Sequence, residues 1–127
     1  MNLNISETKA YYDAIAPEAL CDCAYCRNYR ARIRTAYPKI AAWLDSIGIN
    51  IEKPFETSPA EPDNRGMLEY CGCQYIVFGI CEPDYHHRID DIEIRVARSH
   101  PGTGLEREHF VLEFFPITLK FGKEMPM

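Results

Sequence analysis

The sequence lacks the features that assign a chain to a nucleic-acid-binding or membrane class. Its 14 basic residues face 19 acidic ones, which gives a formal net charge of −5. Binding to a phosphate backbone depends on clustered Lys and Arg, so nucleic acid is disfavoured as a partner. No apolar run approaches the roughly 20 residues of a membrane span, and the first residues form no apolar secretory signal. The expected compartment is therefore the cytoplasm, with no membrane partner.

A complete catalytic motif is also absent. No serine lies in a nucleophile elbow, and the run Gly102-Thr103-Gly104 lacks the lysine and the strand-to-helix context of a phosphate-binding loop. His86 and His87 are adjacent, so in a strand they face opposite sides and do not chelate one ion. These absences favour a non-enzymatic function and leave an enzyme as the alternative.

The composition is sufficient for one packed domain. The chain has 127 residues, of which 46% are hydrophobic and 12% aromatic, values typical of a globular domain. We expect a single domain over residues 1–127, with a helical N-terminal part (1–50) and an antiparallel sheet (67–127). The intervening segment, 51–66, contains three prolines and no hydrophobic periodicity, so it is predicted to be a connecting loop.

Residues 23–47 show a strong helical periodicity. Their apolar side chains recur every three or four positions and share one arc of about 120° on a helical wheel; they are Tyr25, Tyr29, Ile33, Ala36, Tyr37, Ile40, Trp43, Leu44 and Ile47. Pro38 interrupts this pattern, because its ring clashes with the carbonyl group four residues earlier in a helix. The pattern fits either one long helix kinked at Pro38 or two helices that share a buried face.

The second half of the sequence is typical of antiparallel strands. We expect strands over residues 68–80, 85–98 and 108–115, followed by a short extended segment over 117–121. Within the second of these, apolar and charged residues alternate, as in a strand with one solvated face. The predicted fold class is α+β, with the long helix packed on a three- or four-stranded antiparallel meander sheet.

Five of the six cysteines form two tight groups. The first is C-x-C-x-x-C and the second is C-x-C with a glycine between; together they are Cys21, Cys23, Cys26, Cys71 and Cys73. Tetrahedral zinc has Zn–S bonds of about 2.3 Å, which hold the sulfurs less than about 4 Å apart. The spacing predicts a structural zinc site that joins the start of the long helix to the first strand. The alternatives are buried reduced thiols and disulfide or redox chemistry.

Two functions follow from these patterns. The first is a small intracellular binding or regulatory domain, braced by its cysteines and by zinc, which engages an unidentified protein partner. The second is a thiol- or metal-dependent enzyme whose site lies beside the cysteine cluster, with Cys26 as the nucleophile at the helix start. A basic stripe on the helix, Arg27, Arg30 and Arg34, is either a solvated face or a docking surface for an acidic partner or a phosphate group.

Overall fold

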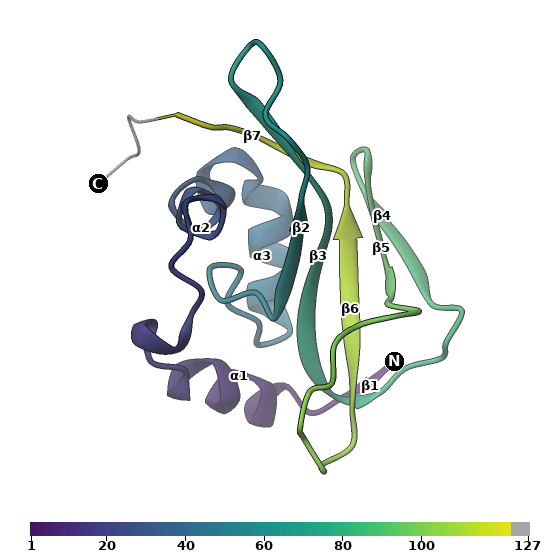
Figure 1. Cartoon of the computed structure of the whole chain (residues 1–127). Helices are drawn as coiled ribbons and strands as arrows, with labels where there is room; N and C mark the ends of the chain where they lie inside the picture. The colour runs from purple at the N-terminus through teal and green to yellow at the C-terminus, as the bar shows by residue number, and fades with distance from the viewer. Residues whose placement is uncertain (123–127) are drawn as a thin grey trace.

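In the computed structural model, which describes residues 1–122, helices and antiparallel strands are mixed (Figure 1). The helical elements are α1 (Ile5–Ala14), the short 3-10 helix η1 (Pro17–Ala19), α2 (Ala24–Ala36) and α3 (Pro38–Ser46). The strands are β1 (Asn2–Leu3), β2 (Glu56–Pro59), β3 (Met67–Ile80), β4 (His86–Ile89), β5 (Ile92–Val96), β6 (His109–Phe115) and β7 (Ile117–Lys120). Within the described residues, no helix is both long and apolar enough to cross a bilayer.

The helical part differs from the prediction of one long helix. α2 ends at Ala36 and α3 begins at Pro38, so two separate helices carry the apolar periodicity. Tyr37, between them, has φ −130° and ψ 66°, because a residue that precedes proline is kept out of the α-helical region. Pro38 fits the first position of α3, where the N–H that proline lacks has no helical partner. The prediction of a single long helix is therefore wrong.

The sheet also differs from the predicted three- or four-stranded meander. Over residues 1–122 it has seven strands in the order β1-β3-β6-β5-β4, and β2 and β7 pair with β3 as well. β3 and β4 follow each other in the chain but do not pair, because β6 and β5 lie between them. β2 falls inside the predicted connecting loop, 51–66, so that prediction is wrong for residues 56–59. The sheet curls into a half-barrel around its long central strand, and α2 and α3 lie against one face of it (Figure 1).

The long strand β3 contains a bulge at residues 71–72. The register with β2 changes from Thr57 opposite Cys73 to Pro59 opposite Tyr70, so two residues of β3 oppose one residue of β2. A bulge of this kind reverses the alternation of side chains along the strand. As a result, Tyr70 and Cys73 both point into the core, and both are fully buried.

Buried tyrosine hydroxyl groups connect α1, α2 and the turn after α3 to β3. Tyr12 in α1 donates a hydrogen bond to the carbonyl oxygen of Ile76 at 2.7 Å. The hydroxyl groups of Tyr29 in α2 and Tyr75 in β3 are 2.7 Å apart, and Tyr75 donates to the carbonyl oxygen of Ile51 at 2.6 Å. Since buried polar groups must be paired, these contacts fix how the helices sit on the sheet.

Candidate metal centre

Three cysteine sulfurs lie together just before and within the first turn of α2. The Sγ atoms of Cys21, Cys23 and Cys26 are all within 4.8 Å of one another. Cys21 and Cys23 are exposed and Cys26 is half-buried, so solvent reaches the group. Because zinc holds its sulfur ligands less than about 4 Å apart, only a small inward movement of the side chains is needed for three thiolates to share one ion.

The local backbone explains this arrangement. After η1 the chain has no regular structure up to Cys23, which is the N-cap residue of α2 with φ −70° and ψ 162°. The Cys23 sulfur accepts a hydrogen bond from the backbone N–H of Cys26 at 3.4 Å. A cap residue and the residue three positions later face each other across the first helical turn, so the C-x-x-C spacing brings their side chains together. Cys21 joins them from the irregular segment before the helix.

Basic side chains on α2 hold the cysteine segment in place. Arg30 donates from Nη1 to the carbonyl oxygen of Cys21. Arg27 lies 3.9 Å from Asp22 in a solvent-exposed ion pair. The third residue of the predicted basic stripe, Arg34, instead pairs with two carboxylates in and after α3. The stripe therefore makes contacts within the chain, and two of its arginines lie against residues 21 and 22 of the cysteine segment.

The thiols of Cys23 and Cys26 differ in acidity. The hydrogen bond from the Cys26 N–H lowers the pKa of Cys23 below its usual value. Partial burial, followed by hydrogen bonding to the Cys23 sulfur, raises the pKa of Cys26 to about 12. The helix N-terminus adds partial positive charge beside the cap residue. Of these two residues, Cys23 is therefore the favoured thiolate, which reverses the sequence-based expectation that Cys26 is the more nucleophilic.

A second set of polar contacts ties the start of α2 to the sheet. Tyr70 in β3 donates to the carbonyl oxygen of Tyr25 at 2.6 Å. Asn28 donates to the carbonyl oxygen of Lys120 in β7 at 2.9 Å and to the Tyr70 hydroxyl at 3.4 Å. Sequence reasoning did not identify these residues. Asn28 is a buried polar residue in an amphipathic helix, but nothing in the sequence indicates that Tyr70 faces it.

The second cysteine group is not part of the three-sulfur cluster in the described structure. The bulge at Gly72 turns Cys71 outward, where its sulfur lies 3.6 Å from Glu69 Oε2. Cys73 faces the core and is fully buried, and burial raises its pKa to about 12. The structure thus brings together three of the five predicted ligands. A shared site that includes Cys71 and Cys73 stays a prediction from the sequence.

Three thiols offer a metal ion a set of soft ligands and leave a fourth coordination position open. Zinc and copper(I) are the ions that such sulfur ligands prefer. Comparison with protein-family models, curated proteins and solved structures found no match to this chain. The chemistry of the cysteine group is accordingly the basis for the functional proposal.

Proposed function

We propose that this chain is a small binding domain in which Cys21, Cys23 and Cys26 hold a zinc ion. The observation that supports this most directly is the mutual approach of their sulfurs within 4.8 Å at the start of α2. Zinc binding to thiolates releases protons, and the Cys23 sulfur already accepts a helix N–H bond that favours its deprotonated form. The proposal applies to a reducing compartment such as the cytoplasm, where thiols persist.

The ion would serve a structural purpose in the segment that leads into α2. This segment has little regular structure of its own, because only the short helix η1 precedes the cap residue. A metal bridging Cys21 to Cys26 would fix the segment on the helix, in addition to the bond from Arg30 to the Cys21 carbonyl oxygen. The braced segment would then present a defined surface for a protein partner.

The open fourth position gives the partner a specific way to bind. Structural zinc sites usually have four protein ligands, whereas sites with three keep a position for water or an incoming group. In our proposal the partner supplies the fourth ligand, such as a thiolate or an imidazole. Because two of the three cysteines are exposed, a partner side chain has access to the ion.

Metal analysis of the untagged protein tests the proposal. We expect a single zinc ion per chain by elemental analysis, with six thiols titrated in the same sample after denaturation. Cys23→Ser and Cys26→Ser should each weaken zinc binding by at least about 100-fold, since changes in even the outer shell of zinc sites cost 10–100-fold. A protein that is purified without metal and does not compete with a chromogenic chelator for added Zn²⁺ would refute it.

Two matched variants define which cysteines are ligands. Cys81→Ser is the control, because Cys81 is half-buried beside Glu82 and lies outside the cluster. It should leave zinc affinity unchanged. Cys71→Ser examines the larger site predicted from the sequence: unchanged affinity assigns the ion to the three clustered thiols, and a large loss assigns Cys71 to the site as well.

A thiol-dependent enzyme is the second candidate, and the lowered pKa of Cys23 favours it. An exposed thiolate at a helix N-terminus is a good nucleophile, and Cys26 lies close enough to resolve a bond formed at Cys23. In this case the zinc-free protein should react stoichiometrically with a disulfide such as 5,5′-dithiobis(2-nitrobenzoate) at Cys23. Slow reaction at Cys23, at the rate of Cys81, argues against this candidate and leaves the metal proposal unaffected.

A further inference from the structure

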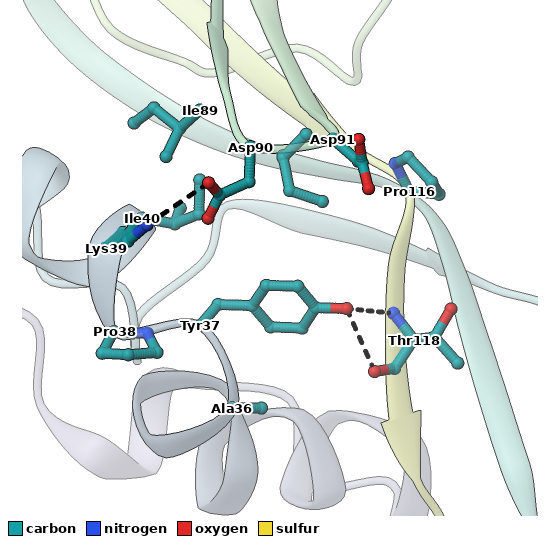
Figure 2. Close-up of a pocket in the computed structure, with 11 residues that line it drawn as sticks. Ala36, Tyr37, Pro38, Lys39, Ile40, Ile89, Asp90, Asp91, Pro116 and Thr118 are labelled. Carbon is teal, nitrogen blue, oxygen red and sulfur yellow. Dashed lines mark hydrogen bonds and ion pairs between the residues drawn. The ribbon is translucent and has the colours of Figure 1, made fainter.

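A cavity of about 440 Å³ lies at the corner between α2 and α3, away from the cysteines. Three distant parts of the chain border it and leave it open to solvent on one side: the α2–α3 junction, the β4–β5 turn and the start of β7 (Figure 2). Its walls are mainly apolar and include Ile40, Ile89, Ile92 and Pro116. This volume falls within the range of roughly 300–1,000 Å³ that is typical of small-molecule sites.

Tyr37 gives the cavity a fixed aromatic wall. Its hydroxyl group donates to the carbonyl oxygen of Thr118 at 3.2 Å and accepts from the Thr118 N–H at 3.0 Å. Figure 2 shows the ring extended from the helix junction to β7, held at its far end by these two bonds. A ring that is positioned before a ligand arrives loses little conformational entropy on binding.

The opposite rim carries the side chains of Asp90 and Asp91. These two residues form the turn between β4 and β5, whose terminal residues Ile89 and Ile92 pair with each other. Asp90 has φ 52°, a left-handed conformation that Asp adopts more readily than most residues. Its carboxylate accepts a hydrogen bond from the ammonium group of Lys39 at 3.3 Å. Asp91 lines the same cavity, and no side chain in residues 1–122 forms an ion pair or hydrogen bond with its carboxylate. The rim therefore has a net negative charge, and one of its carboxylates is available to a ligand.

We propose that this cavity binds a small organic amine. The apolar body of the amine would lie against the isoleucine walls and the ring of Tyr37, and its ammonium group would interact with Asp91. Carboxylates form charge-assisted hydrogen bonds with ammonium groups. The ion pair between Lys39 and Asp90 is an example of the same ammonium–carboxylate interaction within the chain. A carboxylate ligand is disfavoured, because it would face the unpaired charge of Asp91.

Titration of the full chain with three isosteric probes tests charge selection. Phenethylamine, 2-phenylethanol and phenylacetate share an apolar body and differ in the charge of the head group. We expect phenethylamine to bind roughly fivefold more tightly than the alcohol, and the alcohol more tightly than the acid. Amide NMR shifts on the cavity walls, including Ile89 and Thr118, report the site. Absence of binding, or equal affinity for all three probes, overturns the proposal.

Two variants at the rim should change the affinity for the amine in opposite directions. Asp91→Asn should weaken phenethylamine binding by roughly fivefold and leave 2-phenylethanol unaffected. Lys39→Met should strengthen amine binding, because it removes a competing cation and frees Asp90. Asp84→Asn, an exposed change outside the cavity, is the control and should have no effect. If Asp91→Asn binds the amine as well as the wild type, or if Lys39→Met weakens binding, the amine assignment is wrong. These outcomes do not depend on the cysteine site, which shares no residue with the cavity.

Discussion

The buried pair Tyr29 and Tyr75 allows a directional prediction from hydrogen-bond geometry. Each tyrosine hydroxyl has one proton to donate. Tyr75 uses its proton for the carbonyl oxygen of Ile51 at 2.6 Å, so Tyr29 must be the donor in the 2.7 Å contact between the two hydroxyls. The order of donation is therefore Tyr29 to Tyr75 to Ile51. Both rings are fully buried, and water does not replace a lost partner.

This order predicts unequal costs for two chemically identical changes. Tyr75→Phe leaves the buried Ile51 carbonyl without a partner and leaves the Tyr29 O–H with only the sulfur of Cys73, a weak acceptor. A fully stranded buried group costs about 1–3 kcal/mol, and the weakened Tyr29 bond adds about 1 kcal/mol. We expect a total loss of about 2–4 kcal/mol in the free energy of unfolding. Tyr29→Phe leaves the Tyr75 proton on its acceptor and removes only a donor, so about 1 kcal/mol is expected.

Urea denaturation of the two variants at neutral pH measures both values. An unchanged m-value would show that the extent of unfolding is the same in each protein. The double variant should cost less than the sum of the two single changes, because the groups share one network. If Tyr29→Phe is as destabilising as Tyr75→Phe, the assigned direction of donation is incorrect.

Three further predictions concern α1 and the cysteines. Thr8→Val should cost about 1–3 kcal/mol in urea denaturation and more than Thr8→Ser, because the buried Thr8 hydroxyl accepts from the Phe78 N–H at 3.1 Å; equal costs would contradict this. Lys53→Met should lower the free energy of unfolding by about 1 kcal/mol, because the ammonium group of Lys53 donates hydrogen bonds to two carbonyl oxygens at the C-terminal end of α1. An unchanged melting temperature would count against that role. In metal-free protein at pH 7, pulsed iodoacetamide should label Cys23 before Cys26. The lowered pKa of Cys23 increases its thiolate fraction, whereas a pKa of about 12 keeps Cys26 protonated until far above neutral pH; peptide mass mapping with the reverse order would refute this.

Local patterns in the sequence predicted the elements that depend on neighbouring residues. The apolar arc over residues 23–47 identified the buried faces of α2 and α3, and the strand expected over 68–80 corresponds to β3. The C-x-x-C spacing likewise placed Cys23 and Cys26 at a helix start. Each of these inferences needs only the period of one element, which the sequence contains.

The arrangement of the elements could not be read from the same patterns. Pairing of β3 with β6 joins Cys73 to Phe114 across 41 positions, and no local signal distinguishes it from a hairpin with β4. The turn at Asp90 contains no glycine, so the strand expected over 85–98 was not divided into β4 and β5. The sequence does not predict β2, because the prolines in its segment indicate a loop, although proline is tolerated in an edge strand.

The bulge in β3 changes what a metal ion would do in this fold. A flat strand would place Cys71 and Cys73 on one face, where they would join the helix start to the sheet. The bulge at residues 71–72 separates them, so the clustered ligands all come from six consecutive positions. Closing so short a segment constrains few residues, and a bound ion would stabilise the start of α2 without connecting it to β3. That connection is made instead by Tyr70, whose hydroxyl donates to the carbonyl of Tyr25 in the turn that carries the cysteines.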